Sequence, residues 1–75
     1  GSQVMYQNKI YRVTFLIKQL LEFRVIKKSY WEVFDMSPEM DNKTIMRDIA
    51  EIKRLMKDIY GYELVYNRKE NHYEI

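Results

Sequence analysis

The strongest structural signal in the chain is the stretch DNKTIMRDIAEIKRLMKDIYG, residues 41–61. Its large apolar residues recur every three or four positions, and because a helix turns about 100° per residue they fall on one narrow stripe. The stripe consists of Ile45, Ile49, Ile52, Met56 and Ile59. The opposite side is cationic around one small residue and consists of Lys43, Arg47, Ala50 and Arg54. The pattern predicts an amphipathic α-helix with a basic outer face.

Both ends of this helix carry the expected signals. Asp41 can act as the N-cap, because its carboxylate can accept the free backbone N–H groups of the first turn. Gly61 can end the helix, since glycine readily adopts the left-handed conformation. A capped helix with a basic outer face is typical of a helix that reads a DNA groove. It is also typical of many surface helices, so the helix alone leaves both interpretations open.

The composition indicates one small folded domain. The chain has 75 residues, of which 47% are hydrophobic and 32% charged, enough for a core and a solvated surface. Cysteine is absent, so packing alone must hold the fold. No apolar run reaches the roughly 20 residues that span a bilayer, and no signal peptide opens the chain, so we expect a cytoplasmic protein without membrane contact. The net charge of +2 favours nucleic acid only weakly.

The first third of the chain predicts a second helix. Residues 1–2 resemble a cloning remnant, and the apolar residues 4–6 fit either an arm or a strand. Asn8 can cap a helix over residues 9–24. Its inward stripe is predicted to be Ile10, Val13, Thr14, Ile17, Leu20 and Leu21. Tyr11 and Phe15 lie nearly opposite this stripe, where they are either covered by the N-terminal arm or form a dimer contact.

A short helix and a turn are expected in the middle of the chain. Ser29 and Glu32 have the spacing of a capping box, which predicts a helix over residues 29–36 with Trp31 in the core. Residues 37–40 are predicted to form a tight turn. In the alternative, the long helix starts at Ser37 with Pro38 in its first turn. We favour the turn because Asp41 gives the long helix a cap of its own.

After Gly61 the apolar period changes to two, which predicts a β-hairpin over residues 62–75 with its loop at residues 67–71. One face of the hairpin comprises Leu64, Tyr66, Tyr73 and Ile75. The other comprises Glu63, Val65 and Glu74. An isolated hairpin is marginal in water, so this one must lie on the helices. Whether the N-terminal residues add a third strand to this sheet is left open.

The expected fold class is α+β, with three helices followed by a β-hairpin, which is the element order of a winged helix-turn-helix. Residues 44–49, TIMRDI, resemble the T-I-x-R-D-[IVL] signature in the N-terminal DNA-binding domain of DeoR-type and WYL-domain bacterial regulators. Residues 61–69, GYELVYNRK, and residues 73–75, YEI, resemble the same family's wing. The chain departs from the family pattern at Asp41, where a serine is usual, in the extra residues 37–40, and at His72, where a glycine is usual.

The resemblance implies that the long helix enters the major groove of double-stranded DNA while the wing reaches the flanking backbone or minor groove. The base-contact candidates are Asn42, Lys43, Thr44, Met46 and Arg47, whose side chains can bond base edges or touch a thymine methyl. The phosphate-contact candidates are Arg54, Lys57, Arg68 and Lys69. Asp48, at the edge of the apolar stripe, is expected to hold a neighbouring cation or a helix end.

Groups for catalysis are sparse. His72 is the single histidine, without cysteine partners or metal-ligand spacing, and is expected to be a surface side chain. The carboxylates occur singly, and the two glycines form no phosphate-binding loop. We therefore expect no enzyme, no cofactor, no metal and no small-molecule site.

Two functions from different classes follow. The first is a sequence-specific DNA-binding domain of a bacterial or phage transcription regulator, acting as a homodimer or within a larger parent chain because a lone domain would bind weakly. The second is a protein-interaction module that uses Tyr11, Phe15, Tyr30 and Trp31. The mild net charge and the acidic residues around the hairpin, Glu63, Glu70 and Glu74, favour the second.

Overall fold

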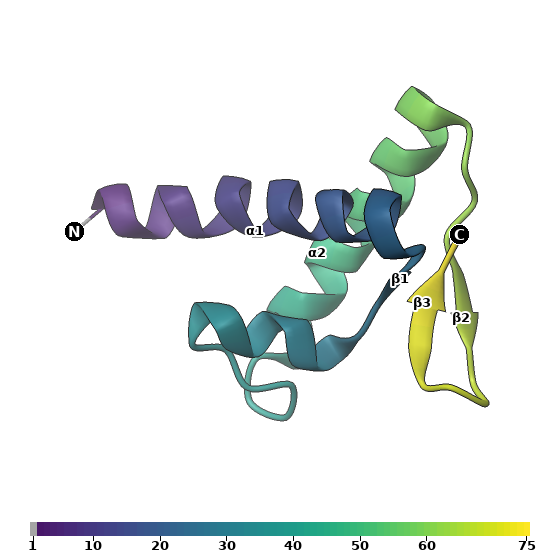
Figure 1. Ribbon diagram of the computed structural model, residues 1–75. Coiled ribbons are helices and arrows are strands. Elements are labelled where there is room, and N and C mark those ends of the chain that lie inside the picture. Colours follow the sequence, from purple (N-terminus) through teal and green to yellow (C-terminus); the bar gives the residue numbers. More distant parts are fainter. Residues whose placement is uncertain (1) are drawn as a thin grey trace.

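The computed structural model describes the backbone of residues 2–75 and the side chains of residues 9–75. Within that part of the chain, three helices group together and a small antiparallel sheet stands beside them (Figure 1). The helices are α1 (Ser2–Phe23), the 3-10 helix η1 (Lys28–Phe34) and α2 (Asn42–Leu55), which continues into a π-helical turn, η2 (Met56–Tyr60). The strands are β1 (Val25–Ile26), β2 (Val65–Asn67) and β3 (His72–Glu74), in the order β1-β3-β2. This α+β arrangement is compatible with a winged helix.

The core lies where the three helices meet the sheet. Its fully buried side chains come from the helices, the η2 turn and strand β1, and are Leu16, Leu20, Ile26, Trp31, Ile45, Ile52 and Met56. Four of the five residues predicted for the stripe of α2 are buried. The fifth, Ile59, is 64% exposed. It lies in the π turn η2, which winds more slowly than an α-helix and so carries Ile59 off the stripe.

Helix α1 corrects several expectations. Residues 4–6 are helical, so they form neither an arm nor a strand, and Asn8 lies inside the helix and does not cap it. The cause is local: residues 2–23 contain neither glycine nor proline. The buried edge is Val13, Leu16 and Leu20, whereas Ile10, Thr14 and Leu21 are exposed. Apolar residues occur on all sides of this helix. The spacing of apolar residues along α1 was therefore not enough to identify the face that packs against the core.

The third strand comes from the segment after α1 and not from the N-terminus. Arg24 ends α1 in the left-handed conformation (φ 67°), and its N–H donates to the carbonyl of Leu20 at 2.9 Å. The chain then turns directly into β1, which pairs with β3 through Val25 opposite Glu74 and Ile26 opposite Tyr73. The hairpin is thereby tied to the helices along one edge.

The short helix was predicted at the right place but with the wrong cap. It starts at Lys28, with Lys27 at the cap position and no side-chain capping bond, so Ser29 lies within the first turn and the capping box does not form. Trp31 is fully buried, as predicted. The helix closes at Asp35, which takes the left-handed conformation (φ 60°).

Helix α2 begins and ends close to the predicted residues. Residues 38–40 form a turn, and Asp41 occupies the N-cap position. Its carboxylate does not cap α2, however, but accepts a bond from the Ser37 N–H at 2.8 Å and so closes the turn. Gly61 ends the helical stretch in the left-handed conformation (φ 73°), as predicted.

The hairpin has the predicted alternation. Val65 lies opposite Glu74 on one face, and Tyr66 lies opposite Tyr73 on the other, with ring centroids 4.8 Å apart. None of the helices within residues 2–75 combines the length and the apolar character that a bilayer crossing needs.

Candidate nucleic-acid interface

The outer face of α2 has the composition that the sequence indicates. Lys43, Arg47 and Ala50 are exposed, and so are Asn42 and Met46 at the flank. Among the side chains of residues 9–75, neither Lys43 nor Arg47 belongs to an ion pair. Their charges can therefore act on a polyanion without first breaking an internal bond. Thr44, predicted beside them, is half-buried.

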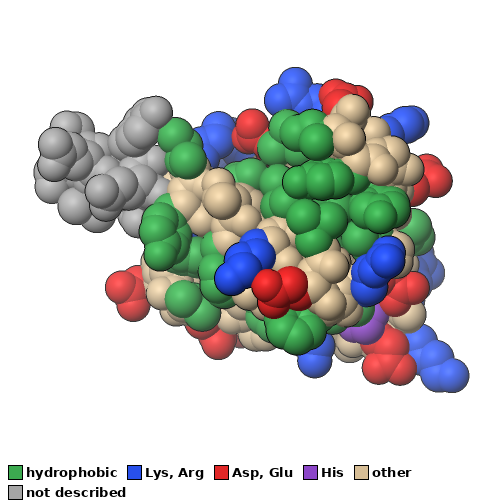
Figure 2. All heavy atoms as spheres, turned by 45° about the horizontal axis from the view of Figure 1, so that its top comes forward, with side chains coloured by type: hydrophobic (Ala, Val, Ile, Leu, Met, Phe, Trp, Pro, Cys, Tyr) green, Lys and Arg blue, Asp and Glu red, His purple; other side chains and the backbone are tan. Residues whose placement is uncertain are grey.

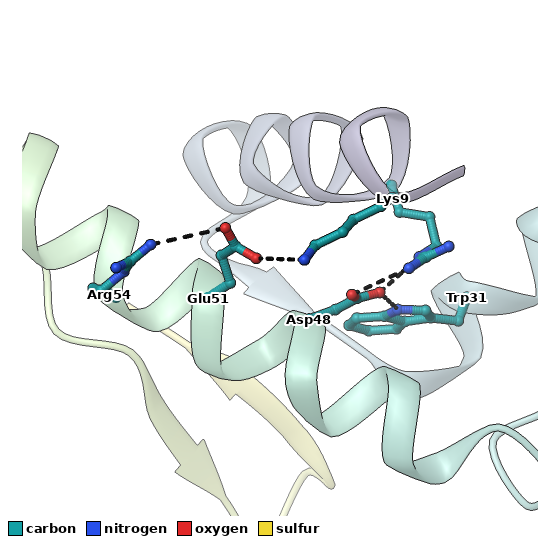
Figure 3. Close-up of polar contacts among 6 residues, drawn as sticks. Lys9, Trp31, Asp48, Glu51 and Arg54 are labelled. Atoms are coloured by element: carbon teal, nitrogen blue, oxygen red, sulfur yellow. Dashed lines mark hydrogen bonds and ion pairs between the residues drawn. The ribbon is translucent and has the colours of Figure 1, made fainter. Parts of the chain in front are cut away.

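The inner edge of α2 is fixed by a buried polar cluster as well as by its isoleucines. Asp48 accepts bonds from Arg12 of α1, at 2.7 Å from Nε and 3.2 Å from Nη2, and from the indole N–H of Trp31 at 3.0 Å (Figure 3). Such a bidentate pair is directional, so it fixes the rotation of α2 about its axis. The predicted structural role of Asp48 is confirmed. Arg12 and Trp31 were not foreseen as its partners, because nothing in the sequence joins positions so far apart.

A second polar chain lies on the side of α2 that faces α1. The carboxylate of Glu51 lies 3.5 Å from Lys9 Nζ and 3.8 Å from Arg54 Nη2 (Figure 3). Arg54, a predicted phosphate contact, therefore shares its charge with a carboxylate that the sequence analysis overlooked. Because the Arg54 side chain is largely exposed, this pair is weak and can open. Lys57 is exposed in η2, one turn further along.

The hairpin loop presents the other two predicted phosphate contacts, Arg68 and Lys69, to solvent. The loop is held by the N–H of Glu70, which donates to the side-chain oxygen of Asn67 at 3.1 Å, and by Asn71 in the left-handed conformation (φ 57°). Glycine is thus not needed here, because asparagine tolerates this conformation.

His72 is not the surface side chain that the sequence suggests. Its side chain is only 12% exposed, and Nε2 lies 2.8 Å from Glu74 Oε1. Asn67 donates to the same carboxylate oxygen at 3.0 Å. Bonds from Asn67 and His72 lower the pKa of Glu74 below its ordinary value. The Asn67–Glu74 bond therefore links strands β2 and β3. Within residues 9–75 no group of acidic or histidine side chains has the arrangement of a metal site.

A contact between helix α2 and the hairpin lies on this surface. The hydroxyl of Tyr73 in β3 lies 4.0 Å from the sulfur of Met46. Burial and the neighbouring Tyr66 raise the pKa of Tyr73 above its ordinary value. The base-contact candidates of the helix and the strands of the hairpin thus belong to one continuous surface.

The aromatic pair on α1 packs against η1, whereas the sequence left open either cover by an N-terminal arm or a dimer contact. Phe34 of η1 packs edge-on against Phe15 at 5.6 Å and Tyr11 at 6.2 Å between ring centroids. Tyr11 nevertheless remains 66% exposed beside a shallow hollow of about 310 Å³ lined by Tyr11, Thr14, Phe15 and Lys18. Trp31, which the protein-interaction hypothesis also used, is fully buried and cannot contact a partner.

Exposed apolar side chains also occur where α1 and η2 end, and include Phe23, Ile59, Tyr60 and Tyr62. Tyr60 and Tyr62 stack with centroids 6.3 Å apart, and Arg24 lies over the Tyr62 ring. Figure 2, which brings the upper side of Figure 1 forward, shows hydrophobic side chains gathered on that face. These exposed apolar side chains are therefore a second surface feature of the molecule besides the exposed cations of α2.

No family model, no curated protein and no solved structure matches this chain.

Proposed function

We propose that this domain binds double-stranded DNA sequence-specifically, with α2 in the major groove and the β2–β3 loop on the neighbouring backbone. A regulator of bacterial or phage transcription is the setting that fits, and it places the domain in the cytoplasm. The supporting observation is the pair Lys43 and Arg47, exposed and without internal ion pairs on a helix whose opposite edge is buried. Both side chains can donate to guanine or to phosphate.

The electrostatics of this face also support the proposal. Lys43 and Arg47 lie one turn apart on α2, and Ala50 follows on the same side without a bulky side chain. A duplex can therefore approach the backbone of α2 closely. Arg68 and Lys69 add positive charge at the hairpin loop. Such contacts release counterions from DNA, so the affinity is expected to fall steeply with salt.

The experiment is a selection of bound duplexes from a random pool at low salt, followed by a titration of the selected duplex at several salt concentrations. Recovery of one motif, with an affinity that falls as salt rises, supports the proposal, and a palindromic motif would indicate a homodimer. Recovery of no motif, with no binding of any duplex at low salt, would refute it.

A second candidate function is a protein-interaction module. The observation in its favour is the exposed Tyr11, which borders the hollow on α1 and packs against Phe34. On this alternative the chain binds no duplex at low salt, and replacing Tyr11 by Ser abolishes capture of a protein partner. The basic face of α2 would then serve only solubility.

A further inference from the structure

The contact between α2 and the hairpin continues into a strip of partly exposed side chains. The Tyr73 hydroxyl touches Met46 at 4.0 Å, and the Tyr73 ring packs at 58° against Tyr66, 4.8 Å between centroids. A continuous row of contacts therefore runs from the second turn of α2 across the hairpin. We call its three members, Met46, Tyr73 and Tyr66, the tyrosine strip. Met46 is 41% and Tyr66 42% exposed.

The charges at the two ends of the strip indicate what covers it. Lys43 and Arg47 lie on α2 next to Met46, and Arg68 follows Tyr66 by two residues with Lys69 behind it. The acidic neighbour Glu74 lies on the other face of the hairpin from Tyr73, where Asn67 and His72 bond its carboxylate. A partner must therefore offer apolar or flat surface in the middle and negative charge on both sides. The sugar–phosphate backbone has this pattern, because its sugars lie between phosphates.

We propose that the tyrosine strip is a contact for the DNA backbone, lying between the groove-reading turns of α2 and the loop of the hairpin. The proposal rests on the DNA-binding function and adds two residues, Tyr66 and Tyr73, that the sequence analysis did not assign to it. The rings pack against sugars, and the hydroxyl of Tyr66 donates to a phosphate oxygen. In the free domain that hydroxyl donates to Asn71 at 3.3 Å, an exposed bond that a phosphate can replace.

The chain contains a matched control. Tyr60 is 45% exposed and stacks on another tyrosine, Tyr62, as Tyr66 packs on Tyr73, but it lies at the far end of the α2–η2 stretch. The full chain is titrated, at one low salt concentration, into a fluorescein-labelled pool of random-sequence duplexes, and binding is followed by fluorescence anisotropy. The variants are Tyr66→Ala, Tyr66→Phe and Tyr60→Ala.

Tyr66→Ala is expected to weaken binding about tenfold and Tyr66→Phe about threefold, because the first loses ring and hydroxyl and the second only the hydroxyl bond. Tyr60→Ala is expected to bind as the unmodified chain does. The salt dependence of Tyr66→Ala should keep its slope, since no positive charge is removed. If Tyr66→Ala does not fold, Tyr66→Phe, which keeps the ring, decides the question.

Three outcomes would overturn the proposal. If both Tyr66 variants bind as tightly as the unmodified chain while Arg47→Ala binds weakly, DNA binding stands and the strip has no part in it. If the unmodified chain binds neither the random pool nor a selected duplex, the DNA function and the strip fail together. If sedimentation shows a dimer that Tyr66→Ala converts to a monomer, and DNA affinity follows only that dissociation, the strip is a contact between two copies.

Discussion

Asp48 of α2 and Arg12 of α1 form a bidentate ion pair, with N–O distances of 2.7 and 3.2 Å, across 36 positions of sequence. Both side chains are almost fully buried, and the indole of Trp31 completes the cluster. Each helix of the domain contributes one member. The residue next to Asp48 on α2 is Arg47, so the same turn of helix carries both the internal anchor and the exposed cation.

The first prediction concerns this pair. Asp48→Asn is expected to lower the free energy of unfolding by about 3–5 kcal/mol, because it leaves the Arg12 charge buried without a counter-charge. The measurement is a urea unfolding curve monitored by circular dichroism. The double variant Arg12→Met, Asp48→Leu should lose less than the sum of the two single changes, because an apolar pair leaves no buried charge. Strictly additive losses would show that the two side chains do not interact energetically.

The second prediction concerns Trp31. Trp31→Phe removes the N–H that bonds Asp48 and leaves a space beside it, so a loss of about 2 kcal/mol in unfolding free energy is expected. Val33→Ala, in the same short helix but with an exposed side chain, serves as the control and should change stability by less than about 0.5 kcal/mol. An equally mild effect of both changes would contradict the role assigned to the indole.

The third prediction concerns the exposed cation. Arg47→Ala should weaken binding to the selected duplex by about 1–3 kcal/mol if it contacts a base, and reduce the discrimination against altered sites. The melting temperature should not change, because the side chain has no internal partner among residues 9–75. The control is Lys18→Ala, which removes one positive charge from the side of α1 beside Tyr11 and Phe15. Equal loss of affinity in both variants would indicate an effect of net charge alone.

The fourth prediction concerns pH. The folded hairpin lowers the pKa of Glu74 below the ordinary 4.5, through bonds from Asn67 and His72. A carboxyl group with a lowered folded pKa contributes stability that is present above pH 4.5 and is lost as the pH falls through the lowered value. Glu74→Gln should therefore reduce the urea midpoint at neutral pH, and the difference from the unmodified chain should shrink below pH 4.5. Glu70→Gln, in the exposed loop, should show no such convergence.

The fifth prediction concerns the end of the α2–η2 stretch. Gly61 has a φ of 73°, and a Cβ added there would meet nothing within 4 Å, so the cost of a side chain is backbone strain alone. Gly61→Ala is expected to destabilise the domain by about 1 kcal/mol. Gly61→Asn should cost less, since asparagine tolerates the left-handed conformation. Equal stability of all three chains would show that the end of this stretch is frayed in solution.

Local signals predicted most of the secondary structure. The stripe of α2, the stop at Gly61 and the alternation of the hairpin each arise from near neighbours, whose geometry the backbone fixes. The errors in the predicted secondary structure concern the residues that cap the helices. Ser29 has the spacing of a cap, yet the short helix starts one residue earlier, and Asp41 uses its carboxylate on Ser37 instead of on α2. In both cases the residue whose spacing marks it as a cap makes no capping bond to its helix, because spacing shows which bond is possible and not which one the packed chain makes.

The pattern of residues was sufficient to predict the order of the three helices and the hairpin, the exposed position of Lys43 and Arg47 on α2, and the buried edge opposite them, but not strand β1. These follow from helical periodicity, which involves residues three or four apart. Only the packed structure shows that Arg12 and Trp31 meet at Asp48, that β1 joins the sheet, that Lys9 approaches Glu51, and that Tyr73 touches Met46. Most of these contacts join residues distant in sequence, and they depend on how the helices and strands pack together.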